Sequence, residues 1–181
     1  MSKLAVTEYL TLDGVFENPG GWSFPYWNDE AARFKYDELF ASDALLLGRV
    51  TYEGFAAAWP TMKGTGDFGE RMNSMPKYLV SATLQNPTWN NTTLIRGDVI
   101  AEVQRLKLQL GRNILVAGSS ALVLELTQHN LVDDYWFMVH PLVRGGGKRF
   151  FKEGTEAALK LVEAKTTAGG IAILHYQPAE K

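Results

Sequence analysis

Two stretches of the sequence join a run of apolar residues to a glycine and then to helix-forming residues. The first reads LLLGRVT at residues 45–51, and the second reads ILVAGSSA at residues 114–121. Free backbone N–H groups at a helix start, together with the positive end of the helix dipole, bind anions such as phosphate. Arg49 adds a permanent charge on a planar group that suits phosphate oxygens. Two such junctions fit a ligand with two or three phosphate groups, such as a dinucleotide.

Neither junction is one of the familiar nucleotide-binding motifs. Neither reads G-x-G-x-x-G or G-x-x-x-x-G-K-[ST], so neither junction is a Rossmann fingerprint or a P-loop. The alternative is that each glycine only permits a tight turn between strand and helix, with no ligand bound there.

The elements that must position these junctions alternate between strand and helix patterns. Apolar and β-branched runs predict strands at residues 3–11, 44–48, 77–81, 92–95, 113–118 and 133–143. Apolar spacing and capping residues predict helices at 28–42, 51–59, 98–111 and 119–130, whereas 64–74 is ambiguous. ALKLVEAKTT and IAILHYQ flank Ala168-Gly169-Gly170, which predicts a closing hairpin. The pattern indicates an α/β domain of about eight strands with an antiparallel end, whose ligands sit at the carboxyl ends of strands.

Composition limits the classes of protein that fit. The chain has 181 residues, of which 46% are apolar and 21% charged, so we expect one globular domain over residues 1–181. A net charge of −2 gives no reason to expect nucleic acid or an acidic membrane as a partner, so any anion site must be local. The absence of cysteine excludes disulfides and thiolate chemistry. The N-terminus lacks a signal-peptide pattern, and we expect a cytoplasmic protein.

Other conspicuous residues allow two interpretations each. His129, His140 and His175 lack the spacing of a metal site, so we expect packing or surface roles and no metal. Trp22 and Trp59 are candidates to wall a pocket for a flat heterocycle, although tryptophans are usually core residues. The basic loop at residues 144–149 either meets a phosphorylated substrate or is a solvated turn.

The order of motifs along the chain resembles the dihydrofolate reductase-like family. L-D-G, L-G-R-x-T-Y-E, P-K-Y-x-V-S and I-x-V-x-G occur in sequence, followed by L-V-D-D, His-Pro and a glycine-rich turn that ends in Phe-Phe. Within this family the chain is most similar to the C-terminal reductase domain of bacterial riboflavin-biosynthesis deaminase–reductases and their free-standing relatives. The resemblance extends from about Leu4 to Tyr176. It implies a three-layer domain in which helices flank a central mixed sheet, with a C-terminal antiparallel hairpin.

The resemblance also implies NADPH as the cofactor. Arg49 would meet the adenosine 2′-phosphate, Thr51 a bridging phosphate, and Ser81 would lie near the 2′-phosphate. Ser119 replaces the second glycine of the usual Gly-Gly turn, so a conformation that favours glycine would be strained or changed there. Val6, Thr7, Asp13 and Gly14 fall where the family lines the nicotinamide end of the cofactor. The other cofactor-binding residues expected on this basis are Gly48, Arg49, Val50, Thr51, Val80, Ser81, Ala82, Gly118, Ser119, Ser120 and Ala121.

The chain departs from the dihydrofolate reductases at the carboxylate that binds the pteridine. The Trp22-to-Pro25 spacing matches the family, but Trp27 stands where the acid is expected. Asp29 and Glu30 are expected to face solvent in the first turn of a helix. The hypothesis is therefore an NADPH-dependent reductase of the riboflavin-biosynthesis type, acting on a small heterocyclic or sugar-carbonyl substrate. Bound water, Asp13 or the substrate would supply the proton. The alternatives are a dihydrofolate or pteridine reductase and an NADPH-binding protein without catalysis.

The sequence and the resemblance together make three further predictions. Gly48, Ser81 and Gly118 should lie at the same edge of one sheet, because a shared ligand requires it. Strand 133–143 carries Tyr135 to Met138 consecutively, so a side of it that no helix covers would form an exposed apolar patch. On this basis, and from the family resemblance, we expect a homodimer. Arg49 should select NADPH over NADH, since the two cofactors differ only in the 2′-phosphate.

Overall fold

The computed structural model describes residues 1–179 and contains one eight-stranded sheet with helices on both faces. The strands are β1 (Leu4–Thr11), β2 (Ser42–Gly48), β3 (Lys77–Val80), β4 (Thr92–Ile95), β5 (Asn113–Ala117), β6 (Asp134–His140), β7 (Leu159–Thr166) and β8 (Ala172–Pro178). The helices are α1 (Asp29–Phe40), α2 (Arg49–Ala58), α3 (Gly66–Ser74), α4 (Val99–Gln109) and α5 (Ser120–Gln128), with 3₁₀ turns at Pro19–Gly21 and Phe24–Tyr26.

The strand order is β4-β3-β2-β5-β1-β6-β8-β7. The pairs from β4 to β6 are all parallel, whereas β8 pairs antiparallel with both β6 and β7. The sheet is therefore mixed, and its antiparallel end is the predicted hairpin. Because β3, β2 and β5 are parallel neighbours, their carboxyl ends meet at one edge.

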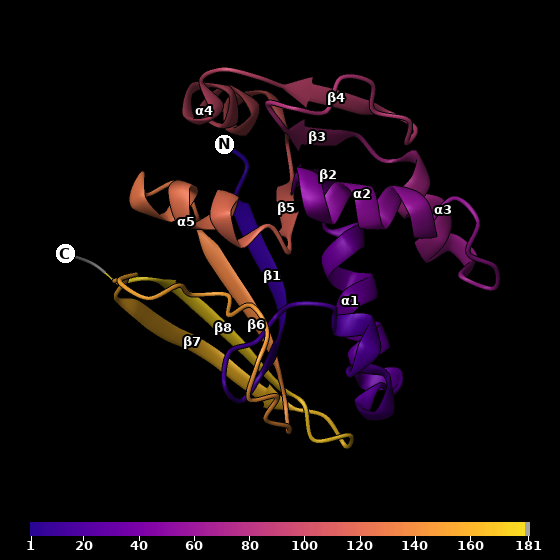
Figure 1. Cartoon of the computed structure of the whole chain (residues 1–181), viewed down its shortest axis with the longest axis vertical. Helices are drawn as coiled ribbons and strands as arrows, with labels where there is room; N and C mark the ends of the chain where they lie inside the picture. The colour runs from indigo at the N-terminus through magenta and orange to yellow at the C-terminus, as the bar shows by residue number, and fades with distance from the viewer. Residues whose placement is uncertain (180–181) are drawn as a thin grey trace.

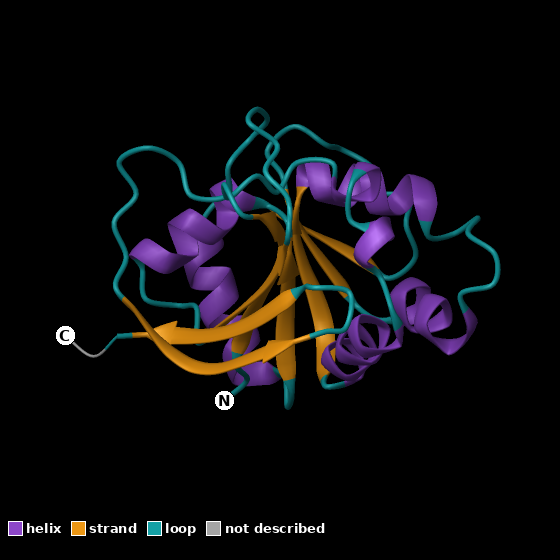
Figure 2. Ribbon diagram, turned by 90° about the horizontal axis from the view of Figure 1, so that it is seen from below, coloured by secondary structure: helices purple, strands orange, loops and turns teal. Residues whose placement is uncertain are grey.

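Two layers of helices cover the sheet (Figures 1 and 2). On one face, buried side chains of α4 and α5 pack against even-numbered β1 residues such as Val6 and Leu10. On the other face, residues of α1, α2 and α3 pack against Leu45, Leu47 and Leu79. Buried strands that carry apolar side chains on both faces, such as ALLL in β2, explain why these strands read as continuous apolar runs. The arrangement has three layers, as expected. No helix within residues 1–179 is long and apolar enough to cross a membrane.

The element predictions differ from the structure in two informative places. The ambiguous stretch at 64–74 forms α3 in its last nine residues, although two glycines lower its helix propensity. α2 begins at Arg49 rather than at Thr51, because Gly48 already occupies the extended N-cap position.

The condition for an outward apolar patch on strand 133–143, an uncovered side, is not met. β6 ends at His140 and lies inside the sheet, where Tyr135, Phe137 and Met138 are buried. Trp136 stacks on His175, with ring centroids 3.9 Å apart, and contacts Phe34. Neighbouring side chains thus cover both faces of this strand, and the homodimer stays a prediction without this support.

Candidate active site

The two glycine junctions are in direct contact at the carboxyl edge of the sheet. The backbone N–H of Gly48 donates to the Ser119 hydroxyl oxygen at 2.8 Å. The backbone N–H of Ser119 donates to Thr51 Oγ1 at 3.1 Å, and the Ser119 hydroxyl lies 3.2 Å from the same atom. Because β2 and β5 are neighbours, these contacts join the starts of α2 and α5 into one unit. The prediction that Gly48 and Gly118 share one edge is confirmed, and Ser81, which follows β3, lies at that edge too.

The turn at Gly118 and Ser119 has a left-handed backbone. Both residues have positive φ, 56° at Gly118 and 59° at Ser119. A side chain on Gly118 would place its Cβ 2.6 Å from Thr51 Oγ1, so only glycine fits there. Ser119 keeps the glycine-like conformation and bears a strain of roughly 1–2 kcal/mol. Its hydrogen bonds to Gly48 and Thr51 offset part of that cost.

The helices that start at this edge have no side-chain cap. The first N–H groups of α2 and α5 donate to no N-cap side chain, and those of α3 donate to none either. By contrast, Asn28 caps α1 and Asp98 caps α4, each accepting from a backbone N–H at 3.0 Å. Uncapped helix starts leave backbone donors that need an acceptor. Two such starts in contact therefore form a cradle suited to adjacent phosphate groups.

The polar side chains of this cradle suit a phosphate as well. Thr51 Oγ1 accepts from the backbone N–H of Ser119, and the Ser119 hydroxyl can donate either to Thr51 Oγ1 or to the Ala117 carbonyl at 3.1 Å. In the first arrangement, the Thr51 hydroxyl hydrogen is free for a phosphate oxygen. Arg49 lies exposed at the start of α2 and forms an i,i+4 ion pair with Glu53 at 2.8 Å. An exposed pair of this kind is weak, so Arg49 can turn toward a stronger anion. Val50 and Ala121 are exposed beside the two helix starts.

Ser81 has a structural part in the next turn. It is buried, and its hydroxyl oxygen accepts from the backbone N–H groups of Thr83 at 3.3 Å and Leu84 at 3.0 Å. Val80, the last residue of β3, pairs with Gly48, and Ala82 is exposed. The Ser81 hydroxyl therefore shapes the loop beside the cradle.

Asp13 anchors one loop to another. Its carboxylate accepts from Thr11 Oγ1 at 2.6 Å and from the backbone N–H groups of Arg144 at 3.1 Å and Gly145 at 2.8 Å. The hydrogen bond from Thr11, followed by those from the two backbone donors, lowers the pKa of Asp13 to about 2. At neutral pH this group is an ionised acceptor, which argues against Asp13 as the proton donor.

The remaining candidates at the expected nicotinamide end have different environments. Val6 is buried in the core and pairs with Val116. Gly14 turns the first loop with a φ of 79°. Thr7 is buried, and its hydroxyl oxygen accepts from Lys35 Nζ at 2.8 Å.

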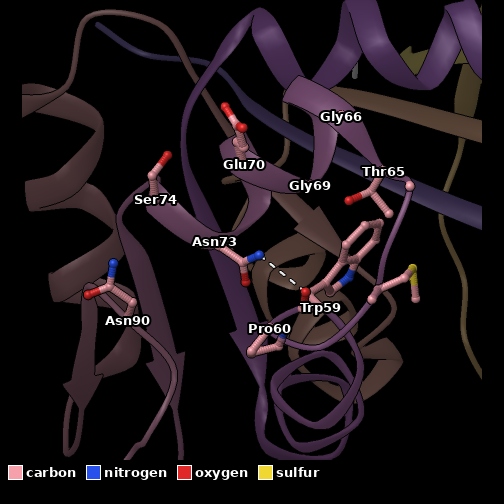
Figure 3. Close-up of a pocket in the computed structure, with 11 residues that line it drawn as sticks. Trp59, Pro60, Thr65, Gly66, Gly69, Glu70, Asn73, Ser74 and Asn90 are labelled. Carbon is pink, nitrogen blue, oxygen red and sulfur yellow. Dashed lines mark hydrogen bonds between the residues drawn. The ribbon is translucent and has the colours of Figure 1, made fainter.

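The structure does not bring Trp22 and Trp59 together around one cavity. Trp22 is buried, packs edge-on against His140, and donates its indole N–H to the Glu17 carbonyl at 3.0 Å. Trp59 lies at the other end of α2 from the cradle, because that helix runs back across the sheet. It lines an open pocket with α3 residues such as Asn73, which donates to the Trp59 carbonyl at 3.2 Å (Figure 3). The two tryptophans therefore do not wall one shared pocket, and a substrate-binding role for either of them stays a prediction.

A buried group of charged residues was missed by the sequence analysis. Lys35 of α1 forms an ion pair with Glu38 and donates to Thr7 of β1. Glu8, the next residue of β1, is also buried. The sequence gives one sign of this buried group, which is the single glutamate within the apolar strand pattern LAVTEYL. The partnership with α1 is not visible in the sequence, because the residues lie about 30 positions apart.

A second pocket opens beside the start of α5. It has a volume of about 520 Å³ and is lined by Ser120, Lys148, Arg149, Phe151, Lys152 and Glu153. Three of these side chains are cationic and one is anionic. The basic loop at residues 144–149 therefore contributes to a pocket that borders the cradle.

Comparison with known proteins identifies the family to which the chain belongs. Residues 2–173 match the family model described as the RibD C-terminal domain. The chain belongs to the RibD C-terminal domain family. The chain is 28% identical over 171 residues to the uncharacterized protein YyaP of Bacillus subtilis strain 168, with 92% of this chain and 90% of YyaP covered. It is 26% identical to YwjB of the same organism, with 92% of each chain covered.

Solved structures show the same fold. A Shewanella sp. PV-4 protein assigned by name to riboflavin biosynthesis aligns with a TM-score of 0.79 at 18% identity, covering 99% of this chain and 100% of that chain. Dihydrofolate reductase from Enterococcus faecalis, solved in complex with NADP(H), aligns with a TM-score of 0.67 at 13% identity, covering 98% and 97%. The deaminase–reductase of Thermotoga maritima aligns at 0.69 and 14% identity, and the match spans 98% of this chain but 57% of that one. The fold is therefore that of a dihydrofolate reductase-like domain.

Proposed function

We propose that this protein is an NADPH-dependent reductase that acts on a small heterocyclic or sugar-carbonyl substrate. The observation that carries the proposal is the pair of uncapped helix starts held in contact by Ser119 and Thr51. Membership of a reductase-domain family supports it, as does the NADP(H) complex of a protein with the same fold.

The residues present fit such a cofactor. Backbone donors at the starts of α2 and α5, with the Thr51 hydroxyl, would hold the pyrophosphate. Arg49 would leave Glu53 and pair with the 2′-phosphate, which NADH lacks. NADPH supplies the hydride when it is bound, and the protein orients the substrate and manages the proton.

The pocket beside Ser120 favours a substrate with an anionic group. Lys148, Arg149 and Lys152 surround it at the same edge of the sheet as the cradle. The net charge of the chain is −2, so this concentration of cations is local. A phosphorylated sugar attached to a heterocycle, of the kind named for the Thermotoga maritima reductase, satisfies this chemistry.

The structure gives less support to folate or pteridine reduction. On α1, Ala31 packs against Met138 of β6 and Phe34 contacts Trp136, and neither Ala31 nor Phe34 can recognise a pteridine by hydrogen bonds. Asp29 and Glu30 are exposed, and Glu30 accepts from the backbone N–H of Ala168. Retention of cofactor binding with loss of catalysis is the other alternative.

Titration and an acceptor screen test the proposal. NADPH should bind the wild-type protein more tightly than NADH, as measured by nucleotide fluorescence. NADPH oxidation should then be followed with phosphorylated ribosylamino-pyrimidines, dihydrofolate and simple aldehydes as acceptors. Turnover with the first group alone supports the proposal, and turnover with dihydrofolate alone supports the pteridine alternative. Tight binding with no turnover favours the non-catalytic protein, and no binding contradicts the cofactor itself.

A further inference from the structure

Glu8 is the first residue of β1 that lies beyond the end of β5. Thr7 pairs with Ala117, the last residue of β5, whereas Glu8 pairs only with Phe137 of β6 on the other side. The chain leaves β5 here and enters the turn at residues 118–119. Glu8 therefore flanks the turn that is proposed to hold the cofactor phosphates.

The Glu8 side chain lies on the α5 side of the sheet. Val6 and Leu10, two residues away on either side, pack in the cluster that includes buried residues of α5. Thr7 contacts α1 on the opposite face. Because side chains alternate along a strand, Glu8 belongs to the face of Val6 and Leu10.

The carboxyl of Glu8 has no partner in the described chain. The residue is 3% exposed, and its Oε1 atom is fully buried without a hydrogen bond. A buried polar group without a partner is rare in a folded protein and calls for an explanation. Neither the packing of β1 nor the Lys35–Glu38 ion pair on α1 explains why the Glu8 carboxyl is left without a partner.

Burial and the pairing of the nearby cation both favour the neutral form of this carboxyl. Lys35 is the nearby cation, and its ammonium already pairs with Glu38 and donates to Thr7. Burial raises the pKa of Glu8 well above its ordinary value, Lys35 opposes this rise, and Glu38 adds to it. The strand partner Phe137 carries no charge. Burial therefore favours the protonated form of Glu8, and no acceptor for its proton lies among the residues that the structure describes.

We propose that Glu8 is the proton donor of the reduction and that Lys35 is a positioning residue that confines the negative charge to Glu38. This inference rests on the proposed function. The substrate's carbonyl carbon gains a hydride from NADPH, which is oxidised to NADP⁺, and the carbonyl oxygen gains the proton as the O–H bond of Glu8 breaks. The resulting Glu8 carboxylate then recovers a proton from solvent.

A test that needs no substrate follows from the charge of the cofactor. The nicotinamide ring is positive in NADP⁺ and neutral in NADPH. If Glu8 faces that ring, NADP⁺ lowers the Glu8 pKa and displaces its proton, whereas NADPH does not. Calorimetric titration in buffers of different ionisation enthalpy at pH 7 should show about one more proton released with NADP⁺ than with NADPH.

Glu8→Gln should abolish this difference while both cofactors still bind, and Glu125→Gln, an exposed change on α5, should preserve it. Binding of both cofactors with no extra proton from the wild type, or with the extra proton retained in Glu8→Gln, overturns the proposal. If neither cofactor binds the wild type, the proposed function itself fails, and the role of Glu8 falls with it.

The wild-type protein alone gives a second measurement, in case Glu8→Gln does not fold. While Glu8 is protonated in the free protein, the affinity for NADP⁺ relative to NADPH should rise about tenfold per pH unit. A ratio of the two dissociation constants that stays constant between pH 6 and pH 8 would overturn the proposal.

Discussion

Two pairs of helices begin in different ways. α1 and α4 begin at Asn28 and Asp98, whose side chains accept from the backbone three residues later. α2 and α5 begin at Gly48 and Ser119 without such a bond, and their starts contact each other at the carboxyl edge of the sheet. Side-chain caps stabilise a helix, so their absence at two adjacent starts is a cost unless a ligand supplies the acceptors. α3 also lacks a cap, so it is the contact between two uncapped starts, rather than a missing cap alone, that marks α2 and α5 as the helices expected to bind a ligand.

The largest expected effect is on cofactor binding by the uncapped helices α2 and α5. Arg49→Ala should weaken NADPH binding by about 10- to 100-fold, because a charge-assisted hydrogen bond is worth roughly 1.5–3 kcal/mol. NADH binding should change little, since it lacks the 2′-phosphate. Dissociation constants from fluorescence titration check both values.

Arg33→Ala is the matched control for Arg49→Ala. Arg33 forms the same i,i+4 ion pair with an acid, Asp37, but on the capped helix α1. It should leave both affinities unchanged. Equal losses for NADH and NADPH in Arg49→Ala would mean that Arg49 supports the fold or the pyrophosphate instead.

The capped pair should show the opposite behaviour. Asp98→Ala should lower the free energy of unfolding by about 1 kcal/mol, because the first turn of α4 loses its acceptor. NADPH affinity should not change. Urea unfolding and NADPH titration measure the two quantities, and a loss of affinity without a loss of stability would remove the distinction between the pairs.

A smaller effect is expected at the strained turn. Ser119→Gly relieves a left-handed serine but removes the oxygen that accepts from Gly48. The relief of backbone strain and the loss of the hydrogen bond are of similar size and opposite sign. The free energy of unfolding should therefore change by less than about 1 kcal/mol. A loss well above that, measured by urea unfolding, would show that the contact between the two helix starts is stronger than the geometry suggests.

The smallest effect concerns the acid that holds Arg49. Glu53→Gln frees the guanidinium from an exposed ion pair worth about 0.3–0.5 kcal/mol, so NADPH should bind about twofold tighter. Asp37→Asn, the equivalent change on α1, should have no effect. Weaker NADPH binding in Glu53→Gln would mean that Glu53 orients Arg49 rather than competing for it.

The sequence predicted the strands, the placement of both glycine junctions at one edge and the family, because these depend on local patterns. It placed the start of α2 two residues late, since Gly48 gives no side-chain signal of a cap. It did not show that Trp22 and Trp59 lie apart, because the length and direction of α2 decide which edge Trp59 reaches. The contact of Lys35 with Thr7 and the loop anchored by Asp13 join distant segments, which a residue pattern does not encode.

The most direct test of the central claim follows the backbone amides of the helix starts during NADPH titration. In ¹H–¹⁵N spectra, the amide signals of residues 49–51 and 119–121 should shift together as NADPH binds, while those of Ala31 and Ala101 at the capped starts should not. Shifts at only one of the two junctions, or at the capped starts as well, would contradict the account.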